Sequence, residues 1–105
     1  SKIFPIVHAE SSEERSVLYQ EIQRFSDNLD DGFRDYFSRE MKKVVLSLRA
    51  KYPEVSMTAI PEIDLAIGGS GNATEDIPDE LREIVLQEFE AAARPVMKKI
   101  ARNLK

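Results

Sequence analysis

An apolar stripe with helical spacing runs through the first half of the chain and constrains the fold more than any other feature of the sequence. The turn-forming segment at residues 27–32, Asp-Asn-Leu-Asp-Asp-Gly, divides it into two halves. Apolar residues three and four positions apart lie on one face of a helix, so each half predicts an amphipathic helix. The stripe comprises Leu18, Ile22, Phe25 and Leu29 before the turn, and Phe33, Phe37, Met41, Val44 and Leu48 after it.

Two arrangements of this stripe compete. The first is a helical hairpin with a tight turn around residues 28–31. The second is a single bent helix from Ser12 to about Lys51, which would be about 60 Å long and would need a partner, most simply a second copy, to cover its apolar face. We favour the hairpin because average helices are short and turn-forming residues are dense between residues 27 and 32.

Two further segments have the patterns of strands. Residues 2–8 are apolar and β-branched and predict a strand, which Pro5 would place at a sheet edge; an apolar arm docked on a neighbour is the alternative. Residues 55–67 alternate apolar and polar side chains on either side of Pro61, which predicts two strands or one strand with a bulge. A last helix is predicted to begin at Pro78, and Pro95 should kink or break it.

The predicted order is therefore strand–helix–helix–strand–strand–helix. This order predicts a helix-dominated α+β fold, with about three helices packed on a small antiparallel sheet. The length of 105 residues fits a single domain at residues 1–105. Residues 68–76 hold three of the four glycines and are predicted to form a flexible loop. Because apolar stripes this wide need cover, we expect a homo-oligomer, most simply a homodimer.

The sequence offers little of the side-chain chemistry that common catalytic and metal sites use. It has no cysteine and a single histidine, His8, whereas zinc sites normally need several such ligands. Around Gly32, Ser38 falls where an EF-hand needs a bidentate glutamate. Glu62 and Asp64 would share one face of a strand and could hold a metal ion, but a solvent-exposed strand face explains them more simply. We predict no catalytic residue, no cofactor and no metal ion.

Charge is divided along the last predicted helix. Residues 75–90 hold seven acidic residues and one basic residue, whereas residues 91–105 hold basic residues and no acidic one. The helix dipole favours this distribution, and an acidic partner or a nucleic-acid backbone bound by the basic half is the alternative. The candidate partner-binding residues are Arg94, Lys98, Lys99 and Arg102.

These observations predict a function more by exclusion than by a motif. A net charge of −4 argues against a dedicated nucleic-acid binder. The absence of cysteine suits a reducing compartment, and no apolar run approaches the roughly 20 residues of a membrane helix. We expect a cytoplasmic, non-catalytic protein–protein interaction or assembly module, such as an adaptor, an inhibitor or a structural subunit, with no membrane partner. The alternatives are a nucleic-acid-associated regulator that uses the basic last helix and a small metal-dependent hydrolase.

Overall fold

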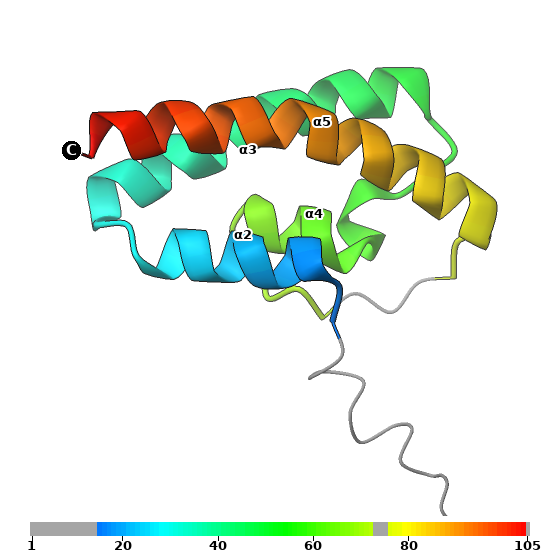
Figure 1. The fold of residues 1–105 in the computed structure, drawn as a ribbon. Coiled ribbons are helices and arrows are strands. Elements are labelled where there is room, and N and C mark those ends of the chain that lie inside the picture. The colour runs from blue at the N-terminus through cyan, green and yellow to red at the C-terminus, as the bar shows by residue number, and fades with distance from the viewer. Residues whose placement is uncertain (1–14, 73–75, 105) are drawn as a thin grey trace, which may run out of the picture.

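The computed structural model describes residues 15–72 and 76–104, and within these ranges it contains helices and no strand (Figure 1). The elements are α2 (Val17–Asp27), α3 (Asp31–Lys51), the 3₁₀ helix η1 (Met57–Ala59), α4 (Pro61–Ala66) and α5 (Asp79–Asn103). The predicted α+β class is therefore wrong, because the described helices pack on one another and not on an antiparallel sheet. The strand predicted at residues 2–8 lies outside the described residues.

Local hydrogen bonds produce the break between α2 and α3. Asp30 caps α3, since its Oδ1 accepts a hydrogen bond from the backbone N–H of Phe33 at 3.0 Å. The guanidinium of Arg34 donates to the carbonyl oxygens of Ser26 and Leu29, at 3.1 and 2.6 Å, and so fastens the turn. The chain forms two helices that run in opposite directions (Figure 1), as the hairpin alternative predicts, and not one long helix.

The core lies where α3, α5 and α4 meet. α3 and α5 lie side by side and antiparallel, and α4 lies between this pair and α2 (Figure 1). Ile22, Phe37 and Met41, from the two predicted stripes, are at most 1% exposed within the single chain. A second copy is not needed to cover these stripes, so the packing reason for expecting a homodimer no longer holds. The homo-oligomer itself remains a prediction.

Residues 55–67, predicted as strands, form η1 and α4 instead. Pro61 is the first residue of α4, where its fixed φ and missing N–H suit a helix start. The N-cap Ile60 and the helical residues Ile63 and Ala66 are spaced three residues apart and are each at most 3% exposed, so they point to the same buried side. A segment this short fits the periods of both a strand and a helix. Packing against α2 and α3 decides in favour of the helix.

The last helix continues through Pro95, where a kink or break was expected from the missing N–H. α5 is a single helix from Asp79 to Asn103. Pro95 and Ala91 are both exposed, so water can hydrogen-bond the Ala91 carbonyl that has lost its partner. The predicted break is therefore absent.

The glycine-rich segment that follows α4 folds back on the helices over residues 68–72. The N–H of Gly69 donates to the Asp64 carbonyl at 2.8 Å, and the N–H of Gly71 donates to Asp64 Oδ2 at 3.0 Å. Gly71 is buried, has a φ of +77° and packs against Tyr19. These contacts tie the segment to α2 and α4. The flexibility of residues 68–76 remains a prediction, and residues 73–75 lie outside the described chain.

Candidate functional site

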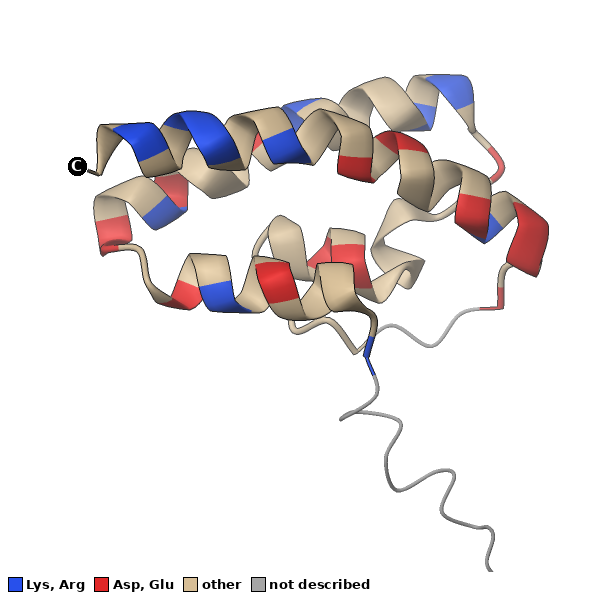
Figure 2. Ribbon diagram, viewed as in Figure 1, with Lys and Arg blue, Asp and Glu red and all other residues tan. Residues whose placement is uncertain are grey.

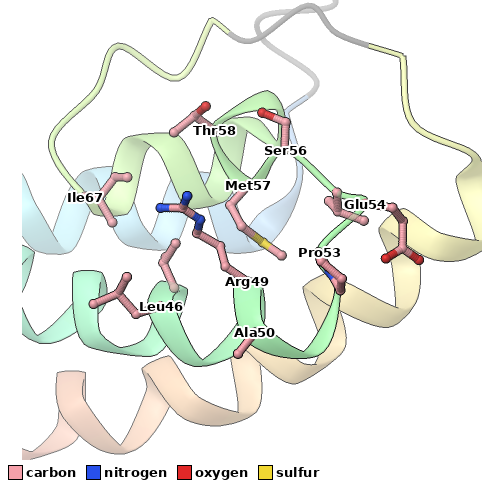
Figure 3. Close-up of a pocket in the computed structure, with 11 residues that line it drawn as sticks. Leu46, Arg49, Ala50, Pro53, Glu54, Ser56, Met57, Thr58 and Ile67 are labelled. Atoms are coloured by element: carbon pink, nitrogen blue, oxygen red, sulfur yellow. The ribbon is translucent and has the colours of Figure 1, made fainter.

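An open hollow of about 820 Å³ lies between the C-terminal half of α3 and the segment at residues 53–58 (Figure 3). We call it the α3–η1 groove. Its apolar walls include Leu46 and Ala50 from α3, Met57 from η1, and Ile67. Leu46 is 61% exposed although its neighbour Val45 is buried. An exposed leucine in a hollow with apolar walls is typical of a site that receives an apolar side chain.

Arg49 brings a positive charge to this groove. Because it follows Leu46 by three residues on α3, the two side chains lie on the same outward face of the helix. Figure 3 shows the Arg49 guanidinium extending from α3 into the hollow, whereas the Glu54 carboxylate is directed away from it. Arg49 forms no ion pair with any other side chain of the described chain. The groove therefore combines apolar walls with an available guanidinium.

A buried carboxylate, Glu62, forms a second polar feature at the start of α4. Its side chain is 4% exposed and meets three helices. Ser16 donates a hydrogen bond to Oε2 at 2.6 Å while its hydroxyl also caps α2. Arg82 of α5 approaches Oε1 with its Nη2 at 3.6 Å, and Oε1 has no hydrogen-bond partner. Glu62 thus joins α2, α4 and α5 with one oxygen left unsatisfied.

A polar cluster links the end of α3 to α5. Lys51 Nζ lies 3.0 Å from Oε1 of Glu88, and the Tyr52 hydroxyl donates to Oε2 of the same carboxylate. The hydrogen bonds from Tyr52 and Lys51 lower the pKa of Glu88. The hydrogen bond to Glu88 in turn raises the pKa of Tyr52 and of Lys51. Because every polar group in the cluster has its partner there, we interpret it as a structural link.

The basic residues predicted to bind a partner are not equivalent in the structure. Arg94 bridges two helices, with Nη2 at 2.8 Å from Glu21 of α2 and Nε at 2.7 Å from Glu90 of α5. These two hydrogen bonds raise the pKa of Arg94. The other residues of the set lie exposed on the basic half of α5 (Figure 2) and form no ion pair with another described residue: Lys98, Lys99 and Arg102. Arg94 therefore has a structural partner, whereas the remaining cations face solvent.

Of the residues considered for metal or hydrolytic chemistry, those that the structure describes do not form a metal site. His8 lies outside the described residues. Glu62 and Asp64 do not share a strand face, because both belong to α4: Glu62 is buried, and Asp64 accepts a hydrogen bond from the N–H of Gly71. Within residues 15–72 and 76–104, no three His, Cys, Asp or Glu side chains lie close enough together to hold a metal ion.

Of the two features of interest, the exposed Leu46 had a weak signal in the sequence and the buried Glu62 had none. The three consecutive apolar residues Val44, Val45 and Leu46 cannot all face the core of one helix, so one exposed apolar residue could have been expected there. Glu62 gave no signal of burial, because an acidic residue just after a helix-starting proline normally faces solvent and favours the helix dipole.

The comparisons with known proteins assign no function to the groove or to the buried carboxylate. Comparisons of the chain with protein-family models, with curated proteins and with solved structures gave no match. Among the described helices, none combines the length and the apolar character that crossing a membrane requires. A functional proposal must therefore rest on the geometry of the surfaces themselves.

Proposed function

We propose that the protein is a non-catalytic interaction module that binds a segment of a partner protein in the α3–η1 groove. The partner segment carries an apolar side chain next to a carboxylate. The single observation that supports this proposal is the exposed Leu46 in a hollow of about 820 Å³ with partly apolar walls, beside the guanidinium of Arg49, which forms no ion pair with another described residue.

The chemistry of the groove determines the chemistry of the partner. An apolar side chain that covers Leu46 and the groove walls would be stabilised by about 1.5–3 kcal/mol through its removal from water. A carboxylate beside it would form a charge-assisted, bidentate pair with Arg49, which restricts both the sign of the charge and the direction of approach. Because the groove accepts few side chains and association has an entropic cost, we expect dissociation constants on the order of 10–100 µM.

The proposal includes a reducing, cytoplasmic compartment, and the absence of cysteine in the 105-residue sequence supports it. Homo-oligomerisation is a competing use of the same surface. A second copy seated on Leu46 would occupy the groove and exclude a partner segment, so the two uses are distinguishable by experiment.

Selection from a random peptide library tests the proposal directly. The wild-type protein is the bait, and the affinities of the selected peptides are then measured for wild type and for the Leu46→Asp variant. We expect enrichment of peptides with an apolar residue adjacent to Asp or Glu, and a loss of affinity of at least about tenfold in Leu46→Asp. Ile84→Asp is the matched control, because Ile84 is 47% exposed on α5 and does not line the groove.

A charge exchange tests the role of Arg49. Arg49→Glu should weaken binding of the acidic peptides, and replacing their carboxylate residue with lysine should restore binding to this variant. Peptides that bind wild type, Leu46→Asp and Arg49→Glu equally would refute the proposal. Sedimentation of the free protein gives an independent check, since concentration-dependent self-association that Leu46→Asp abolishes would assign the groove to a second copy instead.

A further inference from the structure

One oxygen of the buried Glu62 carboxylate lacks a hydrogen-bond donor. Glu62 is 3% exposed and is the single charged residue buried among the described residues. Its Oε1 has no hydrogen-bond partner, and the ion-paired Nη2 of Arg82 stands at 3.6 Å, beyond hydrogen-bond distance. A buried carboxylate oxygen without a donor is costly in free energy. A cation that brought a hydrogen to this oxygen would therefore be bound favourably.

The surface beside Glu62 is hollowed between α2, α4 and α5. Two hollows of about 450 and 260 Å³ open there, and both are lined by Ser16, Glu62, Glu83 and Leu86. Because they share these residues, the two hollows are parts of one cleft, which we call the Glu62 cleft. It lies on different elements from the α3–η1 groove.

The positive charges around the Glu62 cleft are engaged, whereas one negative charge is not. Arg15 donates to the carbonyl oxygen of Gly71 at 2.6 Å, and Arg94 is held by acidic residues of α2 and α5. Glu83 is exposed and forms no ion pair with another described residue. The cleft therefore has at its rim a carboxylate without an ion pair among the described residues, and beneath its surface an unsatisfied carboxylate oxygen next to Arg82.

We propose that the Glu62 cleft binds a primary ammonium group, supplied by a lysine side chain or by a free alkylamine. An ammonium carries one positive charge and three N–H donors. One N–H donates to Oε1 of Glu62, and the charge is shared with Glu83 at the rim. Arg82 has a side chain that is 38% exposed and makes no hydrogen bond to Glu62, so it moves into solvent when the ammonium takes its place. In the free protein, the Arg82 side chain lies next to Oε1 of Glu62 and competes with the ammonium for this position.

The unsatisfied oxygen also determines which cations are excluded. A quaternary ammonium has the same charge but no N–H donor, so it cannot satisfy Oε1. Water can donate a hydrogen bond to Oε1, but it carries no charge and would leave Arg82 in place as the counter-ion of Glu62. Selectivity for primary over quaternary ammonium is therefore the signature of this site.

A thermal-unfolding titration at constant ionic strength tests the proposal, with n-butylammonium chloride as ligand and tetramethylammonium chloride as matched control. For a dissociation constant near 10 mM, about 50 mM n-butylammonium should raise the unfolding midpoint by about 4 °C. Tetramethylammonium should raise it by less than about 1 °C. In a parallel titration, ¹³C NMR should show the Glu62 carboxyl carbon shifting with n-butylammonium alone.

Substitutions of Glu62 and of Arg82 should have opposite effects on n-butylammonium binding, and a third substitution serves as the control. Glu62→Gln should abolish the n-butylammonium effect, whereas Glu80→Gln, the same change at an exposed position of α5 outside the cleft, should retain it. Arg82→Gln removes the competing guanidinium and should tighten n-butylammonium binding at least threefold. Because this variant keeps the buried carboxylate, it remains informative if Glu62→Gln does not fold.

The results separate binding from a purely structural ion pair. If Glu62 and Arg82 are only a structural pair, Arg82→Gln will lower the unfolding midpoint and n-butylammonium will not restore it. That outcome, or equal effects of the primary and quaternary ions, would overturn the proposal. Parallel titrations with spermidine and with Nα-acetyl-lysine amide identify the source of the ammonium, because the tighter ligand distinguishes a free polyamine from a lysine side chain.

Discussion

Replacement of Gly71 by alanine should destabilise the protein by about 2–5 kcal/mol. Gly71 has a φ of +77°, and a side chain in this left-handed region costs about 1–2 kcal/mol. An added Cβ would also lie 2.8 Å from Cε2 of the buried Tyr19 and closer still to its hydroxyl. Displacement of a packed aromatic ring typically costs a further 1–3 kcal/mol or so. The sum is a large share of the roughly 5–15 kcal/mol that stabilises a domain.

Urea unfolding followed by circular dichroism measures this effect. With a denaturant dependence of about 1.5 kcal/mol per M, the midpoint of Gly71→Ala should fall by roughly 1–3 M. Gly32→Ala is the matched control. Gly32 lies in the first turn of α3, has no positive φ, and a Cβ there would meet its nearest atom at 3.7 Å. Alanine at that position should stabilise the protein by about 0.4–1 kcal/mol.

A double-mutant cycle separates backbone strain from the clash. Tyr19→Phe removes the hydroxyl that an added Cβ would meet first, so Gly71→Ala should cost less in this background. The cost should not vanish, because the positive φ and the ring remain. Two results would show the reasoning to be wrong: a Gly71→Ala variant within about 0.5 kcal/mol of wild type, or full additivity of the two substitutions.

Three further predictions concern the core, the pH dependence and α5. Phe37→Ala should destabilise the protein by about 3–5 kcal/mol in urea unfolding, because Phe37 is 1% exposed and packs edge-on against the Phe25 ring. The control Val17→Ala, at a position that is 71% exposed, should change the stability by less than about 0.5 kcal/mol. Because the pKa of Glu88 is lowered in the folded state, its carboxylate stabilises the protein above the ordinary pKa of 4.5, and this stability is lost as the pH falls through the folded-state pKa. The urea midpoints of wild type and Glu88→Gln should therefore converge below about pH 4.5. A difference that stays constant with pH would contradict the assigned cause. Pro95→Ala should raise stability by about 1–3 kcal/mol in thermal melts, because the Ala91 carbonyl regains an N–H partner, and a lower midpoint would show that Pro95 suits its site.

Local signals were sufficient to predict the first two helices and the turn between them. The stripe before Gly32 and the stripe after it are each a complete helical face, and the residues between them include Asp30, which caps α3. Length and composition could not decide between a hairpin and one long helix. The structure decides through Arg34, whose hydrogen bonds to backbone carbonyls hold the turn closed. Such side-chain contacts are formed by the folded chain and have no signature in a sequence pattern.

The segment at residues 55–67 was predicted wrongly because its conformation depends on tertiary packing. A six-residue helix such as α4 is not stable alone, so local propensity carries little weight there. Ile60 and Ile63 are fully buried, and their contacts with the surrounding helices stabilise the short helix. The sequence showed that these residues are apolar but not which partners would cover them.

The same segment builds both candidate sites, which explains why neither could be predicted. As a strand, it would have placed Glu62 and Asp64 together on a solvent face. Because the segment folds as η1 and α4, Met57 lines one wall of the α3–η1 groove. Glu62 lies next to the N-terminus of α2, where Ser16 donates a hydrogen bond to it. The charge of Glu62 is then buried because apolar neighbours on the same helix must be buried, and Arg82 does not reach its second oxygen. A buried charge with incomplete compensation reduces stability, and this cost is the reason for proposing that the cleft beside Glu62 binds a ligand.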